Sequence, residues 1–158
     1  MIKLVNDTID NKDIDSLINW LKTYPRLTKG HLTPKLEEKW SNWLDVDYSI
    51  FCNSGSSANL LMLWALVEAG RITRDSKIVV PSNPEVLLLV SVLGLVPNMQ
   101  KILDLCEEHN VILLEDTCES MGSKFRDKKL GTFGLMSSFS TYFGHHISTI
   151  EGGFVSTN

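Results

Sequence analysis

Two adjacent histidines, His145 and His146, lie in the segment FGHHISTIEGG near the end of the sequence. Imidazole titrates near neutral pH, so one of the pair is a candidate general base. Metal binding is disfavoured because adjacent side chains do not readily converge on one ion. The other two histidines, His31 and His109, are distant in sequence. A purely structural role for one of the pair stays open.

A polar turn, CNSGSSAN, spans Cys52 to Asn59. It follows an apolar run, its glycine permits a tight turn, and its small hydroxyl residues begin a helix. The free N–H groups and the positive dipole end of such a helix suit a phosphate group. Simple capping of the helix is the alternative interpretation.

Two carboxylates end the apolar run in LLEDTCES, where Asp116 has Glu119 three residues further on. In open α/β sheets, ligands collect at the carboxyl ends of the strands. A buried carboxylate at such an end can hold a cationic ring nitrogen of a cofactor. The alternative is that Glu115 and Asp116 merely begin a solvated loop.

The elements that must position these residues alternate between helix and strand. Apolar periodicity and capping signals, including Thr33 as a cap, predict helices over 13–21 and 33–44. The polar glycine turn leads into a long apolar helix that ends at Gly70, and another helix is predicted from about 98 to 109. Apolar runs predict strands over 48–52, 77–80, 85–92 and 111–116, and two more in MSSFST and GGFVST. This alternation predicts an α/β fold with a mostly parallel sheet and helices on both faces.

One junction conflicts with that pattern. Only Pro81, Ser82, Asn83 and Pro84 separate the predicted strands over 77–80 and 85–92. Parallel neighbours need a crossover of about a dozen residues or more, usually a helix. The two strands therefore form an antiparallel hairpin, or a crossover is missing.

Composition narrows the functional class. The chain has 158 residues, which suits one domain, and a formal net charge of -4 with no basic stripe, which disfavours nucleic acid and anionic membranes. The longest apolar stretch, over 86–96, is too short to span a bilayer. No signal peptide is evident. Cys52, Cys106 and Cys118 are irregularly spaced, so we expect reduced thiols and a cytoplasmic protein.

Four blocks, RLTKGHLTPKLEEKW, NSGSSANLLM, ILLEDTCESMGSKFRDKKLGTFG and SSFSTYFGHHISTIEGG, occur in an order that resembles one family. The chain is similar, over nearly all of its length, to the DegT/DnrJ/StrS-type sugar aminotransferases. These are pyridoxal phosphate (PLP) enzymes of the aspartate-aminotransferase fold (fold type I). They act on nucleotide-linked keto-sugars in deoxysugar and polysaccharide biosynthesis, including that of lipopolysaccharide.

The resemblance implies a role for each candidate residue. Gly55 and Ser56 would bind the cofactor phosphate, and Ser140 would give a second phosphate contact. Asp116 would pair with the pyridine nitrogen, and Glu119 would lie near the 3-hydroxyl side of the ring. The resemblance also suggests a homodimer.

His145 occupies the position at which aminotransferases of the family hold a lysine that forms a Schiff base with PLP. A branch with the same replacement, the keto-deoxysugar 3-dehydratases, uses pyridoxamine phosphate (PMP). There the histidine removes a proton from the aminomethyl carbon of the cofactor, and the C3 hydroxyl of the sugar is expelled. The resemblance therefore favours a 4-keto-6-deoxysugar 3-dehydratase with His145 as its base, and a packing or orienting role for His146.

Two alternatives stay open, a sugar transaminase and a non-catalytic fragment. A transaminase would need a substitute lysine, and Lys124, Lys128 and Lys129 lie in a loop that does not match the family position. Compared with the family, the chain is a partial large domain over 1–158. From the resemblance we expect a crossover segment that carries the stacking aromatic residue to be missing near 82–84, and a C-terminal small domain to be absent. We therefore expect weak or no activity of the chain alone.

Overall fold

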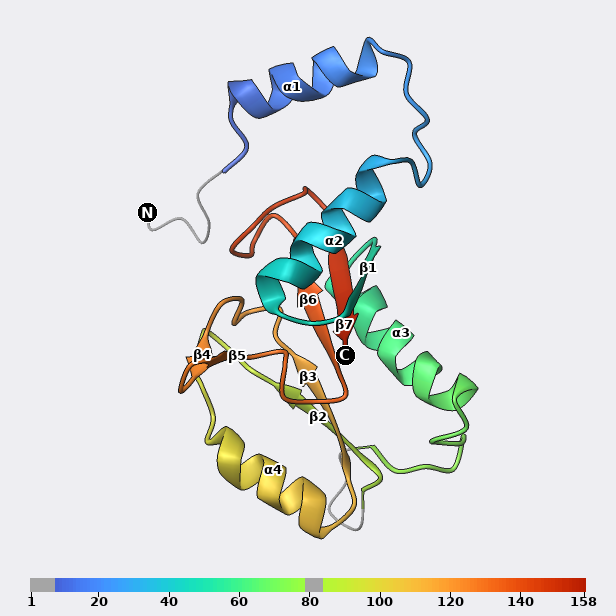
Figure 1. Ribbon diagram of the computed structural model, residues 1–158, viewed down its shortest axis with the longest axis vertical. Helices are drawn as coiled ribbons and strands as arrows, with labels where there is room; N and C mark the ends of the chain where they lie inside the picture. The colour runs from blue at the N-terminus through green and yellow to red at the C-terminus, as the bar shows by residue number, and fades with distance from the viewer. Residues whose placement is uncertain (1–7, 79–83) are drawn as a thin grey trace.

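The computed structural model describes residues 8–78 and 84–158 (Figure 1). In chain order the elements are α1 (Asn11–Leu21), α2 (Leu32–Leu44), β1 (Tyr48–Cys52), α3 (Gly55–Glu68), β2 (Val86–Val90), α4 (Met99–Glu108), β3 (Ile112–Asp116), β4 (Lys124–Phe125), β5 (Lys128–Lys129), β6 (Met136–Ser140) and β7 (Gly153–Thr157). The predicted helices are confirmed, and so are the predicted strands apart from the one over 77–80, which is not among these elements. The short ribbon formed by β4 and β5 was not predicted.

A five-stranded sheet organises the described residues, in the order β1-β7-β6-β3-β2. Strands β2, β3 and β6 pair in parallel, whereas β7 is antiparallel to both β6 and β1. Within this sheet, β7 is thus the strand that runs against the other four. The prediction of a mostly parallel sheet is confirmed.

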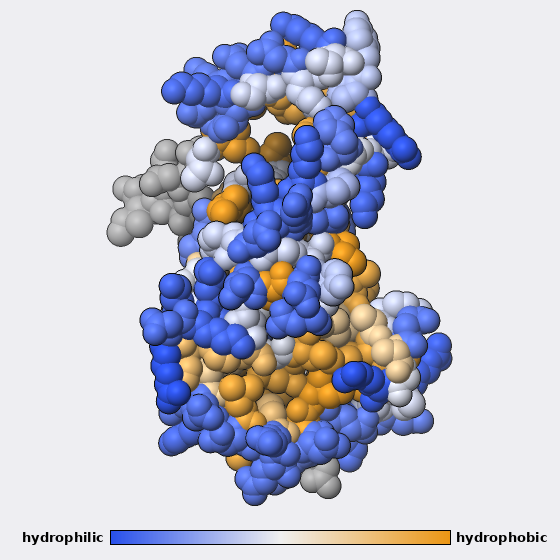
Figure 2. Space-filling model, viewed as in Figure 1, coloured by the Kyte–Doolittle hydropathy of each residue, from blue (hydrophilic) through white to orange (hydrophobic). Residues whose placement is uncertain are grey.

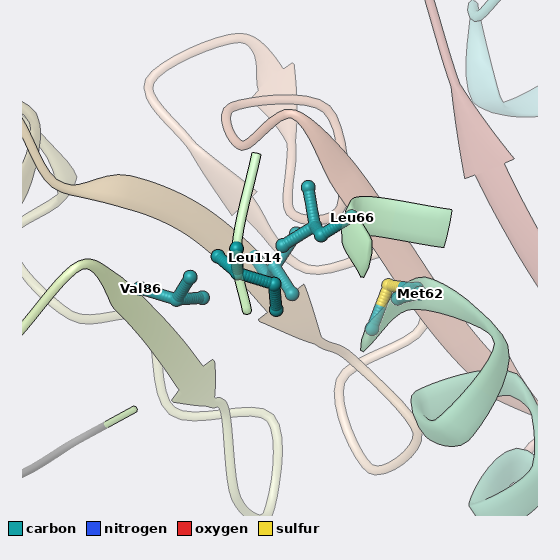
Figure 3. Packing of buried hydrophobic residues seen from close by; sticks show 5 residues of the cluster. Met62, Leu66, Val86 and Leu114 are labelled. Atoms are coloured by element: carbon teal, nitrogen blue, oxygen red, sulfur yellow. The ribbon is translucent and has the colours of Figure 1, made fainter. Parts of the chain in front are cut away.

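Helices cover both faces of the sheet. Successive side chains of β3 point in opposite directions, so neighbouring residues of this strand pack against different helices. Leu114 packs in a cluster with Met62 and Leu66 of α3 and Val86 of β2 (Figure 3). Its neighbour Leu113 packs on the other face, in a cluster with residues of α4. The predicted arrangement of helices on both faces is confirmed.

Helix α2 covers the same face as α4, at the other end of the sheet. Its Trp40 stacks on Phe154 of β7 with ring centroids 4.2 Å apart and an interplanar angle of 2°. Trp40, Leu44, Phe139 and Phe154 together form a buried cluster. The prediction that Thr33 caps this helix is wrong. The helix begins at Leu32, so Thr33 lies inside its first turn, and the N-cap His31 makes no side-chain capping bond.

A bridge at the outer edge of β2 tests the hairpin predicted between the segments over 77–80 and 85–92. Ile78 forms a parallel bridge with Val86, and the N–H of Glu85 donates to the Lys77 carbonyl at 2.9 Å. The antiparallel hairpin is therefore wrong. Residues 79–83, which include part of the predicted strand over 77–80, lie outside the described residues.

Apolar side chains remain uncovered in two helices. In α1, Ile14, Leu17, Ile18 and Leu21 are each more than 40% exposed, and the helix lies apart from the sheet in Figure 1. In α3, Leu60, Leu61, Trp64 and Val67 are exposed on the side away from the core. Figure 2 also shows an apolar hollow bordered by α4. No described helix is long and apolar enough to cross a membrane.

Candidate active site

The start of α3 forms one wall of a cleft. Ser54 is extended, and its hydroxyl oxygen accepts a hydrogen bond from the Ser57 N–H at 3.1 Å, so it caps the helix. Gly55 and Ser56 follow in the first turn, where backbone N–H groups have no partner within the helix. The capping alternative is thus correct for Ser54. It leaves the N–H groups of Gly55 and Ser56 available for an anion.

Ser140 lies against this helix start. A Cβ atom on Gly55 would be 3.3 Å from the Ser140 hydroxyl oxygen and 2.8 Å from the Cys118 sulfur, so the backbone approaches both side chains closely. Ser140 is 5% exposed, and its hydroxyl oxygen accepts from the Tyr142 N–H at 3.3 Å. Residues far apart in sequence therefore meet at one possible phosphate position.

Asp116 ends β3 at the carboxyl edge of the sheet. Its Oδ2 accepts a hydrogen bond of 2.7 Å from the Asn59 amide, and its Oδ1 accepts one of 3.1 Å from the Cys118 N–H. The side chain is half-buried and lines the cleft. A carboxylate held in this way can pair with a cationic ring nitrogen in the cleft.

Glu115 faces the opposite side of the sheet and is 1% exposed. Its carboxylate accepts three backbone hydrogen bonds of 2.7 Å, from Gly131, Phe133 and Gly134. Burial raises the pKa of Glu115, while the three N–H groups act in the opposite direction. The alternative that Glu115 and Asp116 begin a solvated loop is therefore wrong.

Glu119 is exposed at the rim of the cleft. Its Oε2 accepts from the Leu93 N–H at 3.1 Å, and its backbone carbonyl accepts from the Gly94 N–H at 3.1 Å. The neighbouring Ser120 hydroxyl oxygen accepts from the same Gly94 N–H at 3.1 Å. These bonds join the loop after β3 to the loop after β2.

His145 lies in the loop between β6 and β7. The loop is closed at its base, since the Thr141 N–H donates to Gly152 and the Thr149 N–H donates to Thr141, both at 2.9 Å. The His145 ring lies edge-on to Tyr142 with centroids 6.2 Å apart. His145 is half-buried and lines the cleft, whereas His146 is exposed and does not. No metal-binding cluster of three or more His, Cys, Asp or Glu side chains occurs among the described residues.

The cleft has a volume of about 360 Å³, which is within the range of small-molecule sites. It brings together all six residues singled out in the sequence, namely Gly55, Ser56, Asp116, Glu119, Ser140 and His145. It also contains six that sequence reasoning missed, which are Ser54, Asn59, Val90, Cys118, Tyr142 and Glu151. The sequence did contain a signal for Asn59, because it is a lone amide between the small and apolar residues of α3.

The thiol of Cys118 borders the cleft but is a poor nucleophile. Burial raises its pKa most, and the adjacent Asp116 carboxylate raises it further. Cys52 and Cys106 also have pKa values raised by burial, and all three cysteines are free. Since the thiolate is the reactive form, covalent cysteine chemistry is disfavoured at this site.

The sequence profile of the DegT/DnrJ/EryC1/StrS aminotransferase family matches residues 79–158, slightly more than half of the chain. The chain belongs to this family. The family match includes the segments that contribute Asp116, Glu119, Ser140 and His145 to the cleft.

Two curated relatives illustrate the range of chemistry in the family. The GDP-4-keto-6-deoxy-D-mannose 3-dehydratase of Yersinia pseudotuberculosis is 27% identical over 98% of this chain and 50% of its own length. The GDP-perosamine synthase of Escherichia coli O157:H7 is 28% identical over 94% of this chain and 49% of its own length. The chain spans about half the length of these relatives.

Solved structures agree with this assignment. The E. coli GDP-4-keto-6-deoxy-D-mannose 3-dehydratase with bound hydrated PLP is 28% identical, with a TM-score of 0.91 over 99% of this chain and 51% of that chain. A 3-dehydratase with a trapped PLP-glutamate geminal diamine is 27% identical, with the same TM-score of 0.91 and the same coverage of both chains. The predicted fold type I architecture is confirmed.

Proposed function

We propose that the chain contributes the cofactor-binding half of a PLP/PMP-dependent 4-keto-6-deoxysugar 3-dehydratase that acts on a nucleotide-linked sugar. The observation that carries the proposal is that His145 shares one cleft with Asp116, while no lysine lines that cleft among the described residues. The similarity to 3-dehydratases over almost the whole chain supports the same activity.

The residues in the cleft fit the cofactor. Gly55 and Ser56 at the start of α3, with the Ser140 hydroxyl beside them, are suited to its phosphate. Asp116 has a carboxylate fixed by two N–H donors and is suited to the pyridine nitrogen. Glu119 at the rim is assigned to the 3-hydroxyl side of the ring. When bound, the cofactor supplies an electron sink for the sugar chemistry.

His145 acts as the proton acceptor in this proposal. An imidazole exchanges protons readily near neutral pH, and this one is half-buried within the cleft. Loss of the C3 hydroxyl as water needs a proton at the departing oxygen. A protonated His145 is the side chain that we assign to supply it.

A sugar transaminase is the second candidate, favoured by the similarity to GDP-perosamine synthases. It requires an amine that can reach the cofactor. Lys128 and Lys129 instead lie over the rings of Phe133 and Trp43, and neither lines the cleft. These contacts favour dehydration over amino transfer.

The test combines the full chain with PLP or PMP, glutamate and GDP-4-keto-6-deoxymannose, and follows loss of the C3 hydroxyl by NMR. We expect His145→Asn to abolish dehydration and His146→Asn, the matched control, to retain it. His145→Lys should form a covalent bond to PLP that borohydride reduces. A borohydride-trapped lysine adduct on the unmodified chain, or an amino sugar as its main product, would contradict the dehydratase.

A crossover missing near 82–84 is also part of the proposal. Three observations support it. One is the parallel bridge between Ile78 and Val86, and another is the apolar pocket of about 400 Å³ beside Leu87 and Ile102. The third is that the alignment with the Yersinia dehydratase runs over 197 residues, more than the 158 of this chain. Resequencing the coding region around Ser82 tests it. If the chain binds neither PLP nor PMP, it is a non-catalytic fragment of the family fold.

A homodimeric assembly and a cytoplasmic location are further parts of the proposal. We assign a homodimer because residues 60–67 of α3 are apolar on all sides, with Leu61 and Trp64 exposed, and such helices are ordinarily buried. Sedimentation of the unmodified chain and of Trp64→Glu tests this. We expect a dimer for the first and a monomer for the second, and a monomeric unmodified chain would contradict the assignment.

Three free cysteines support a reducing cytoplasmic location.

A further inference from the structure

Three polar side chains connect the core of the sheet to the cleft. The Ser138 hydroxyl donates to Asn59 Oδ1 at 2.5 Å, and Asn59 Nδ2 donates to Asp116 Oδ2 at 2.7 Å. Ser138 belongs to β6, Asn59 to α3 and Asp116 to β3. Because Ser138 and Asp116 are paired residues of adjacent strands, both point to the face that α3 covers.

The donors and acceptors in this chain of bonds have one consistent arrangement. An ionised carboxylate only accepts hydrogen bonds, so the amide nitrogen of Asn59 must face Asp116. The amide oxygen is then left for the hydroxyl of Ser138, which is fully buried. Both ends of the Asn59 amide are thus hydrogen-bonded, and rotation of the amide would break both bonds.

The second oxygen of Asp116 is fixed independently, by the Cys118 N–H at 3.1 Å. Each carboxylate oxygen therefore has one donor from the protein. Since each oxygen can accept more than one bond, lone pairs remain for the cleft. Removal of the Asn59 donor would leave Asp116 held at one oxygen only, free to rotate about its side-chain torsion.

We propose that Asn59 is a positioning residue that orients the Asp116 carboxylate toward the cofactor ring nitrogen. Ser138 holds the Asn59 amide in the orientation in which its nitrogen faces Asp116. This inference rests on the proposed function, because the ring nitrogen belongs to PLP or PMP. A merely structural role for Asn59 would tie α3 to the sheet without affecting the cofactor. The two roles differ in what they do to the ring nitrogen.

The test uses the full chain and PMP labelled with ¹⁵N in its ring. Asn59→Leu removes the donor at similar volume, and Ser138→Ala releases the amide. Asn42→Leu, at an exposed position of α2, is the matched control. Circular dichroism and thermal unfolding establish that each variant folds. The ¹⁵N shift and the Kd of PMP are then measured at one pH.

We expect Asn59→Leu to weaken PMP binding about tenfold or more, and to move the ¹⁵N shift toward that of free PMP. Ser138→Ala should move both in the same direction by less, and Asn42→Leu should change neither. If Asn59→Leu lowers only the unfolding temperature and retains the Kd and ¹⁵N shift of the unmodified chain, the role is structural and the proposal is overturned.

A second measurement separates this inference from the proposed function. If the unmodified chain binds no PMP, the proposed function fails, and the side-chain amide signal of Asn59 decides the inference in the cofactor-free protein. Asp116→Ala should shift that signal and speed its exchange with solvent. An Asn59 amide signal unchanged by Asp116→Ala overturns the positioning role, whatever the cofactor does.

Discussion

The backbone at Gly55 and the side chain of Ser140 are in such close contact that a Cβ atom on Gly55 would lie 2.8 Å from the Ser140 Cβ. Gly55 begins α3 and Ser140 ends β6, 85 positions later in the sequence. The glycine is needed here for space, since its φ is not in the left-handed region. The proposed phosphate position therefore depends on the absence of one methyl group.

Gly55→Ala is expected to separate α3 from β6 and to disturb both of the proposed phosphate contacts. Crowding of a packed site costs about 1–3 kcal/mol of unfolding free energy. Urea unfolding measures this cost, and titration with PLP measures the loss of binding. Gly30→Ala is the control, because the nearest atoms to its new Cβ would be two backbone oxygens at 3.3 and 3.4 Å, and none would be as close as the 2.8 Å contacts at Gly55. Equal effects of the two substitutions would contradict the tight contact.

Glu115→Gln is expected to lower the unfolding free energy by about 1–3 kcal/mol, because an amide cannot accept at both ends and one buried N–H loses its partner. Glu115→Ala leaves all three N–H groups unpaired and should cost more. Chemical denaturation at pH 7 measures both. Glu107→Gln on the exposed side of α4 is the control and should change little.

The effect of Glu115 also has a pH dependence whose sign is fixed. Burial raises the pKa of Glu115 in the folded chain, so the folded state binds the proton more tightly than the unfolded state. The contribution of Glu115 to the unfolding free energy is fully present below its pKa in the unfolded chain, about 4.3. It is lost as pH rises through its pKa in the folded chain. The stability difference between the unmodified chain and Glu115→Gln should therefore be larger near pH 4 than at pH 7. A difference that grows with pH refutes the assignment.

Periodicity and order of segments predicted much of this fold. Continuous apolar residues in β3, and the polar glycine turn that leads into a long apolar run in α3, are local signals, and both elements form as expected. The opposite environments of Glu115 and Asp116 were not predictable. They depend on which face each side chain meets, and on the loop over 131–134 that reaches back to Glu115.

Trp40 joins α2 to the sheet by stacking and by one hydrogen bond. Its indole N–H donates to the Ser156 hydroxyl at 3.2 Å, so Trp40→Phe should cost about 1 kcal/mol. Trp40→Ala also loses the stack on Phe154 and should cost about 3–5 kcal/mol. Trp43→Ala is the control at a side chain that is 41% exposed. If Trp43→Ala lowers the unfolding free energy in urea as much as Trp40→Ala does, Trp40 is not the main contact that fixes α2 on the sheet.

Ile150 has a φ of 72°, in the left-handed region that a β-branched residue rarely adopts. Asparagine tolerates this region, so Ile150→Asn should raise the unfolding free energy by about 1 kcal/mol. Ile147→Asn in the same loop is the control, because Ile147 does not have a positive φ. Thermal unfolding of the two variants compares them. A stability gain shared by both variants would indicate removal of exposed apolar surface instead.

The candidate site was predictable where its residues form recognisable segments. His145, Asp116 and Gly55 lie in blocks whose order is informative, whereas Asn59 acts through partners 57 and 79 positions away. No local pattern encodes such a pairing. Tyr142 and Glu151 were missed for a similar reason, since the shape of the loop between β6 and β7 determines what faces the cleft.

Strand β7 has a consequence for how the chain reaches its fold. It lies between β1 and β6, yet it is synthesised after both. Until residues 153–157 leave the ribosome, β1 has no partner strand in this sheet, and Ser49 cannot meet Ser156, 107 positions later. Closing so long a loop is slow and entropically costly. A nascent chain arrested before Gly153 should therefore remain sensitive to protease in β1, and release of β7 should protect β1.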